Sequence, residues 1–104
     1  MEVVETIDEM QVKSEALRAA GNTIALVPTM GFLHEGHLAL MRMGKEQADH
    51  LVISIFVNPT QFGPHEDFDR YPRDMRGDLK KAQSVGVDTV FTPDVEAMYP
   101  EGFQ

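Results

Sequence analysis

Two histidines, three positions apart, are the residues of this chain whose types and spacing most suggest chemistry. His34 and His37 lie in the segment VPTMGFLHEGHLAL, residues 27–40, between a Pro-Thr-Met-Gly turn and an apolar pattern with helical spacing. The first turn of a helix favours an anion, because its backbone amides are unpaired and the helix dipole is positive there. A histidine beside those amides can donate hydrogen bonds to phosphate oxygens. The segment is therefore a candidate phosphate site.

Two glycines in the same segment support this interpretation. Gly31 ends the turn and can adopt a positive φ without steric cost. Gly36 stands where the helix should start, and without a Cβ it would let a ligand press against the backbone. Taken singly, Gly36 could be a cap and His37 an ordinary polar residue of the first turn. The whole arrangement of strand, turn, H-x-G-H and helix favours phosphate binding.

A metal site is the main alternative for the two histidines. His34 and His37 could face one ion if both were on a helix. However, H-E-G-H lacks the i, i+4 pair that shares a helix face in the H-E-x-x-H zinc hydrolases. A third ligand would have to be His50, His65 or a carboxylate, and no pattern supports one. The spacing therefore disfavours zinc.

A second polar cluster follows the strongest apolar run of the chain. Asn58 and Gln61 carry amide groups that both donate and accept, which suits a small ligand with hydroxyl and carboxylate groups. Asn58 could instead simply start a turn with the proline that follows it. Tyr71 could cover a pocket or pack the loop. Asp78 could be a solvated charge or help to hold Mg²⁺ with substrate phosphates.

Size and composition limit the class of protein. The 104 residues suit one small domain, and no apolar run approaches the roughly 18–20 residues of a membrane span. A net charge of −8 argues against a broad nucleic-acid surface. The absence of cysteine excludes disulfides and thiolate metal sites. The N-terminus lacks the pattern of a signal peptide, so we expect a cytoplasmic protein.

Helices and strands must position these side chains. A helix is predicted over residues 7–20, because TIDE forms a capping box from Thr6 to Glu9 and Gly21 ends the pattern. Short apolar runs bounded by turn residues predict strands at 24–28 and 51–57. The other predicted elements are a strand at 2–5, helices from 35 or 36 to 48 and from 73 to 85, a strand within 88–93 and a helical turn within 94–100.

This alternation predicts an α/β fold, with a parallel sheet and helices on both faces. Ligands of such sheets lie beyond the carboxyl ends of the strands, where the strand order reverses. The two polar clusters follow the strands at 24–28 and 51–57. If these strands are neighbours, both clusters line one crevice.

With these residues identified, the sequence resembles the pantoate–β-alanine ligase family. The matching segments are ALVPTMGFLHEGHLAL, SIFVNPTQF, EDFDRYPRD, DTVFTP and MYPEG, which cover nearly the whole chain in order. The H-x-G-H element alone would indicate only the wider nucleotidylyltransferase superfamily, which includes class I aminoacyl-tRNA synthetases. The run PTMGxLHxGH followed by SIFVNPxQF is far more specific. The resemblance implies a Rossmann-like fold of the H-x-G-H nucleotidylyltransferase type.

The resemblance implies an enzyme that uses ATP and Mg²⁺ to join pantoate and β-alanine in two steps. The pantoate carboxylate attacks the α-phosphorus of ATP, giving pantoyl adenylate and pyrophosphate. The amine of β-alanine then attacks this mixed anhydride, giving pantothenate and AMP. Such a reaction depends mainly on positioning and charge stabilisation.

The resemblance also implies roles for individual residues. His34 and His37 would contact phosphates, with the catalytic role at His37. Gln61 would bind pantoate near the incoming β-alanine, and Asp78 would coordinate Mg²⁺. The implied ATP-binding residues are Pro28, Thr29, Met30, Gly31, Phe32, Leu33, His34, Glu35, Gly36 and His37, and Met30, Asn58 and Tyr71 would line the substrate pocket.

The resemblance covers only the first part of the family's length. Residues 1–104 are therefore expected to be the N-terminal part of the ATP- and pantoate-binding domain, incomplete without the rest of that domain and the C-terminal domain. We expect little or no ligase activity from this piece alone. Family members are commonly homodimers. The alternatives are another H-x-G-H nucleotidylyltransferase acting on a different acid, and a folding or dimerisation module without catalysis.

Overall fold

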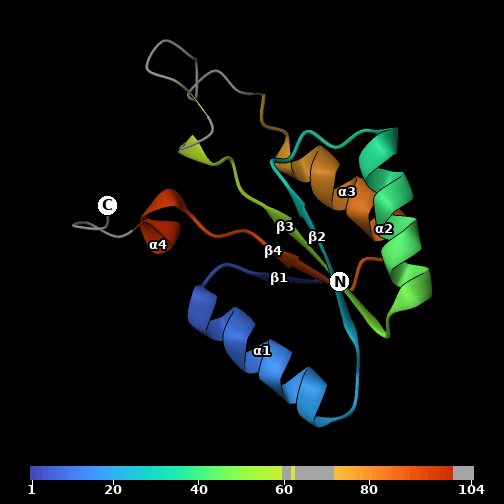
Figure 1. Ribbon diagram of the computed structural model, residues 1–104. Helices are drawn as coiled ribbons and strands as arrows, with labels where there is room; N and C mark the ends of the chain where they lie inside the picture. Colours follow the sequence, from blue (N-terminus) through green and yellow to red (C-terminus); the bar gives the residue numbers. More distant parts are fainter. Residues whose placement is uncertain (60–61, 63–71, 100–104) are drawn as a thin grey trace.

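The computed structural model describes residues 1–59, 62 and 72–99, and strands alternate with helices along them. The order is β1 (Glu2–Val4), α1 (Ile7–Ala19), β2 (Ile24–Thr29), α2 (Glu35–Gln47), β3 (His50–Ile55), α3 (Met75–Val85), β4 (Thr89–Phe91) and α4 (Val95–Met98). Figure 1 shows these elements around one twisted sheet. The predicted order of elements is therefore confirmed.

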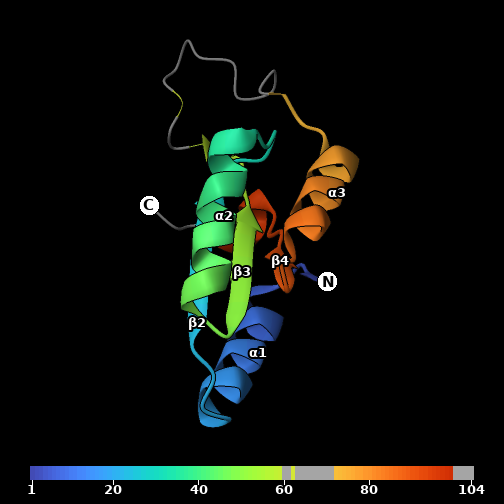
Figure 2. The ribbon, with the colours of Figure 1, turned by 90° about the vertical axis from the view of Figure 1, so that its right-hand side faces the viewer.

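The sheet is parallel, with the order β1-β4-β3-β2. Right-handed crossovers explain which face each helix covers. α2 and α3 make successive steps in one direction, from β2 to β3 and from β3 to β4, and both lie on the same face (Figure 1). α1 returns from β1 to β2 and lies on the opposite face with α4. Figure 2 shows the face that α2 and α3 cover.

Several element boundaries differ from the prediction by one or two residues, and three of the differences have clear local reasons. β3 ends at Ile55, two residues early, because its partner β2 ends at Thr29, which is paired with Ile55. α3 begins at Met75 because Asp74 caps it, accepting the amide of Gly77 at 3.1 Å. α1 ends at Ala19, and the chain then turns at Gly21 with a φ of 87°.

The core lies between the sheet and the α2–α3 layer. Met41 of α2 is fully buried, and four of the six residues of β3 are buried. The opposite face is packed less tightly, since α1 buries none of its residues completely. The core cluster consists of Leu33, Met41, Leu51, Ile53, Ile55, Ala82, Val87 and Val90.

The neighbouring positions of β2 and β3 bring the two polar clusters together. Pro28 pairs with Ser54 and Thr29 with Ile55, so both strands end at the same edge of the sheet. Among the described strands, however, β2 is at the side of the sheet and Leu26 is 61% exposed. Within residues 1–59 and 72–99, no helix is both long and apolar enough to span a bilayer.

Candidate functional site

Thr29 holds the turn that follows β2. Its buried hydroxyl donates to the carbonyl oxygen of Ser54 at 2.9 Å and accepts the amide of Gly31 at 3.1 Å. Gly31 has a φ of 83°, and a Cβ there would lie 3.0 Å from Asp78 Oδ2 and 3.1 Å from Ile55 Cγ2. A side chain at Gly31 is thus opposed by both conformation and lack of space.

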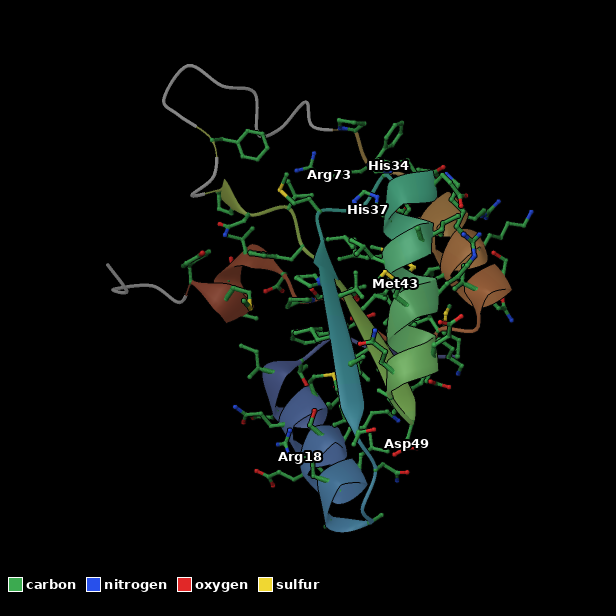
Figure 3. All side chains as sticks on the ribbon, turned by 45° about the vertical axis from the view of Figure 1, so that its right-hand side comes forward. Arg18, His34, His37, Met43, Asp49 and Arg73 are labelled. Carbon is green, nitrogen blue, oxygen red and sulfur yellow. The ribbon has the colours of Figure 1, made fainter. Side chains whose placement is uncertain are left out.

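His34 and His37 together cap the start of α2. His34 is the N-cap, and its Nδ1 accepts the amide of Gly36 at 3.0 Å. Nδ1 of His37 accepts the amide of His34 at 3.1 Å, and the two ring centroids are 4.0 Å apart. This is a capping box made by two imidazoles instead of a hydroxyl and a carboxylate. Figure 3 shows the pair at the upper end of α2, beside the end of β2.

The capping bonds determine which ring nitrogen carries the proton. A nitrogen that accepts a hydrogen bond carries none, so the neutral rings of His34 and His37 are protonated at Nε2. Each Nε2–H is then a donor for an anion. Burial, followed by the neighbouring His34, lowers the pKa of His37, and Asp78 opposes this shift. The site therefore favours the neutral form of His37 more than water does.

The ring of His34 gives a reason within the chain for the glycine at position 36. A Cβ at Gly36 would lie 2.8 Å from Cε1 and 3.0 Å from Nδ1 of His34, whose ring folds back over the glycine. The sequence-based explanation, in which a ligand presses on Gly36, stays a prediction beside this contact. The amides of His34 and Gly36 both point at imidazoles. The sequence predicted that amides at the helix start would donate to an anion, but these two donate to imidazoles instead. The Nε2–H groups of the two rings are then the donors for an anion.

A pocket of about 870 Å³ opens beside the capped helix start. Side chains of α1 and α4 line it together with the ends of β2 and β3, so it lies on the face opposite the core. His37 from the first polar cluster and Asn58 from the second both line it, which confirms the single crevice expected from the sequence. The predicted site residues in this lining are Pro28, Thr29, Met30, His37 and Asn58.

Sequence reasoning missed two residues that line this pocket and one that contacts its lining. The hydroxyl of Tyr99 donates to Oδ1 of Asn58 at 3.1 Å, and the Tyr99 ring lies 6.2 Å from that of Phe56. Ser54 and Phe91 line the pocket itself. Ser54 had a detectable signal, since it interrupts the apolar run of β3. Tyr99 had none, because the turn after β4 brings it to Asn58 only in the folded chain.

The remaining predicted residues of the ATP loop are placed in different surroundings. Phe32 is exposed, with a φ of 51°, while Leu33 is 2% exposed and packs in the core. Glu35 pairs with Arg42 at 2.6 Å on the surface. The Leu33 side chain thus serves the fold. Gln61 and Tyr71, both predicted to bind substrate, lie outside the described residues.

The surroundings of Asp78 do not fit the Mg²⁺ ligand that the resemblance implied. The residue is 2% exposed, and its two oxygens accept the amides of Phe32 and Leu33 at 2.9 and 2.8 Å. Mg²⁺ keeps several waters and needs carboxylate oxygens that face it. Within the described ranges, no three His, Asp or Glu side chains lie close enough to hold a metal ion. The surroundings of Asp78 therefore assign it no metal-binding role.

These features define an α/β domain with a parallel sheet and a pocket that extends along β2 to the carboxyl ends of two neighbouring strands, where His37 and Asn58 line it. The sequence model described as pantoate-beta-alanine ligase matches residues 2–104. The chain belongs to the pantoate-beta-alanine ligase family.

Curated relatives agree with this assignment. A pantothenate synthetase of Acetivibrio thermocellus is 56% identical over all 104 residues, and these cover 37% of its own length. A pantothenate synthetase of Pelotomaculum thermopropionicum is 58% identical over 103 residues, which make up 36% of it. The chain thus spans little more than a third of the length of these relatives.

Solved structures share the fold. Pantothenate synthetase from Thermus thermophilus superposes with a TM-score of 0.85 at 49% identity, over 100% of this chain and 36% of the other. Pantoate-beta-alanine ligase from Francisella tularensis gives 0.89 at 37% identity, over 98% of this chain and 39% of that chain. The latter structure is described as a complex with beta-gamma ATP and beta-alanine.

Proposed function

We propose that this chain is the N-terminal, ATP- and pantoate-binding part of a ligase that condenses pantoate with β-alanine. The observation that carries the proposal is the shared pocket of His37 and Asn58, which opens at the ends of β2 and β3. Membership of the pantoate-beta-alanine ligase family supports the reaction type. The ATP and β-alanine in the Francisella structure support the ligands.

The proposed reaction has two steps, each of which forms one bond and breaks another. A pantoate carboxylate oxygen attacks the α-phosphorus of ATP, and the bond to pyrophosphate breaks. The product is pantoyl adenylate, a mixed anhydride. The β-alanine amine then attacks the acyl carbon, the bond to AMP breaks, and the amine loses a proton as pantothenate forms.

His37 and His34 fit the first step through their outer nitrogens. Their Nδ1 atoms are engaged by backbone amides, which leaves the protonated Nε2 positions to donate to phosphate oxygens. Such donors stabilise negative charge as it grows on the departing pyrophosphate. We assign the catalytic role to His37, because it also lines the pocket.

The other substrate contacts follow from the second cluster. We propose that Gln61 binds pantoate near the incoming β-alanine, with Asn58, Met30 and Tyr71 around it. Asn58 and Met30 line the same pocket as His37. The hydrogen bond from Tyr99 orients the Asn58 amide, because Oδ1 accepts from the hydroxyl and Nδ2 is then the donating end.

We further propose that the piece is incomplete as an enzyme. It spans 36–39% of the relatives compared above, so residues supplied by the rest of their length would complete the site. On this proposal the isolated chain still binds ATP, but it releases AMP far more slowly than an intact ligase does. The cytoplasm is the proposed location, and a homodimer is the proposed assembly, which light scattering would measure directly.

The binding test uses isothermal titration of ATP, pantoate and other small hydroxy acids into the 104-residue chain. We expect ATP to bind to the wild type and not to His37→Ala. Gln61→Ala should lose pantoate and keep ATP. Met43→Ala, on the exposed side of α2, is the control that should keep both. Equal binding of pantoate and unrelated acids would indicate a different nucleotidylyltransferase, and no binding of any ligand would overturn the proposal.

The activity test measures AMP release from ATP, pantoate and β-alanine. Intact enzymes commonly turn over at about 1–10³ per second. A rate in that range from this chain would contradict its proposed incompleteness.

A further inference from the structure

Asp78 occupies the place of a bound anion inside the loop that follows β2. Oδ2 accepts the amide of Phe32 at 2.9 Å, and Oδ1 accepts the amide of Leu33 at 2.8 Å. Successive backbone amides in such a turn form a concave donor site that normally attracts phosphate or carboxylate. Here the anion is a side chain of the same protein, contributed by α3 from 45 and 46 positions away.

The backbone of this loop needs such a partner. Gly31 and Phe32 have φ values of 83° and 51°, and the left-handed region is unfavourable for a phenylalanine. Such a conformation persists only where the surroundings enforce it. Gly31 also lets the carboxylate approach, because a Cβ there would lie 3.0 Å from Asp78 Oδ2. The turn and the carboxylate therefore fit each other.

A second contact from α3 holds the same segment. Nζ of Lys81 donates to the carbonyl oxygen of Leu33 at 3.0 Å. Lys81 is three positions after Asp78 on the helix, so both side chains reach the loop from one helix face. Asp78 binds the donors of the loop, and Lys81 binds the carbonyl that precedes the N-cap of α2.

The contacts change which groups are available to a nucleotide. Most amides between β2 and the first turn of α2 already have acceptors within the chain. They are the amides of Gly31, Phe32, Leu33, His34 and Gly36. A phosphate at this loop would therefore meet imidazole Nε2–H donors in place of these amides.

We propose that Asp78 is a positioning residue, which serves as the internal anion of the Gly31–Leu33 turn and thereby aims His34 and His37 at the phosphates of ATP. We call the two hydrogen bonds from the amides of Phe32 and Leu33 to Asp78 the carboxylate–amide clamp. The identity of the ligand rests on the proposed function, whereas the existence of the clamp does not. The clamp replaces the Mg²⁺ role of Asp78, since an almost fully buried carboxylate with both oxygens engaged is poorly placed to face a metal ion.

The first experiment needs no variant and no ligand. NMR scalar couplings across hydrogen bonds are measured between the Asp78 carboxyl carbon and the amide nitrogens of Phe32 and Leu33 in the wild-type chain. Detection of both couplings is the expected result. Their absence, under conditions where couplings across the β2–β3 ladder are detected, would overturn the clamp. This measurement remains decisive where the chain binds no ATP, an outcome that counts against the proposed function alone.

The second experiment compares Asp78→Asn with Asp74→Asn. Both remove one negative charge from the first part of α3, but Asp74 is exposed and caps the helix, a role that asparagine performs equally well. Asp78→Asn places an NH₂ group against one loop amide. Exchange of the Phe32 and Leu33 amides should be at least about tenfold faster in Asp78→Asn and unchanged in Asp74→Asn, because loss of a charged acceptor opens the turn locally.

Binding data from the same two variants separate positioning from general stability. ATP affinity should fall about tenfold in Asp78→Asn, the factor that corresponds to one lost charge-assisted hydrogen bond, and should not change in Asp74→Asn. Amide exchange in β3 should match the wild type in both. Equal ATP affinity in Asp78→Asn and wild type, with the turn opened, would contradict the positioning role.

A manganese titration tests the metal alternative directly. Mn²⁺ added to the ATP-free wild type should not selectively broaden the amide signals of Phe32 and Leu33. Selective broadening that disappears in Asp78→Asn and persists in Asp74→Asn would show that Asp78 binds the ion, and the proposed clamp would be wrong.

Discussion

His34 and His37 cap the same helix through bonds that link the two rings to one stretch of backbone. Nδ1 of His37 accepts the amide of His34 at 3.1 Å, while Nδ1 of His34 accepts the amide of Gly36 at 3.0 Å. Their ring centroids are 4.0 Å apart. The pair is therefore a structural unit, in which each ring accepts a backbone amide at the helix start and lies against the other ring.

Two substitutions at His34 separate its capping role from its proposed phosphate contact. His34→Ala should lower the free energy of unfolding by about 1 kcal/mol, because the amide of Gly36 loses its acceptor. His34→Asn should retain most of that stability, since asparagine is a good N-cap. Both should bind ATP more weakly than the wild type. Urea unfolding and ATP titration provide the two measurements, and an asparagine variant with full ATP affinity would rule out the contact.

Stability should depend on pH through His37. Its pKa in the folded chain is lowered, chiefly by burial, whereas the unfolded chain has the ordinary value of about 6.5. Between these two values the unfolded chain binds more protons, so stability rises with pH. The contribution of neutral His37 to the free energy of unfolding is complete above about pH 6.5, and it is lost as the pH falls toward the pKa of the folded chain.

Urea unfolding between about pH 5 and pH 8 measures this dependence, with His37→Gln as the control that removes the titrating group. The wild type should lose more stability than the control as the pH falls. A wild-type chain that gains stability relative to the control at low pH would show that the pKa is raised and not lowered.

Alanine variants of Gly31 and Gly21 can be compared to measure what a side chain at positive φ costs in stability. Both have similar backbone angles, 83° and 87°, but only Gly31 is surrounded by Asp78 and Ile55. Gly21→Ala should cost about 1 kcal/mol of unfolding free energy, from conformation alone. Gly31→Ala should cost about 1–3 kcal/mol more, because the Cβ also overpacks the turn. Similar losses of unfolding free energy in both variants would mean that contacts with Asp78 and Ile55 add no cost at Gly31.

Met41 and Met43 provide a matched pair on α2. Met41 is fully buried, whereas Met43 is 53% exposed and is labelled in Figure 3. Met41→Ala should lower the free energy of unfolding by about 2–5 kcal/mol, because it leaves a cavity between the helix and the sheet. Met43→Ala should change it by about 0.5 kcal/mol or less. Thermal and urea unfolding measure both, and the order of the two losses should not reverse.

Local signals in the sequence were sufficient for the elements. The N-cap at Thr6, whose hydroxyl accepts the Glu9 amide at 3.1 Å, and the positive φ of Gly21 bracket α1 as predicted. These signals work because they involve residues within one helical turn of each other. The strand boundary at Ile55 was less predictable, because it depends on where the partner β2 ends.

The histidine pair shows the limit of the same reasoning at the site. The spacing correctly placed His34 and His37 at the start of α2, but it did not predict that the rings accept backbone amides. At Gly36 the sequence predicted a nearby ligand, but it did not predict that the His34 ring would occupy the space a Cβ needs. Side-chain rotamers decide such contacts, and residue types alone do not specify rotamers.

By itself the sequence determined the parallel α/β fold, the helix start at the histidines and the family. These depend on hydrophobic periodicity, caps and motifs that are local along the chain. Only the tertiary structure decided that Tyr99 reaches Asn58 and that Asp78 fills the turn at Gly31. The residues of each pair lie more than 40 positions apart in the sequence, and the sheet order and the packing of α3 bring them together. Contacts of this kind depend on how the elements pack, which no local pattern encodes.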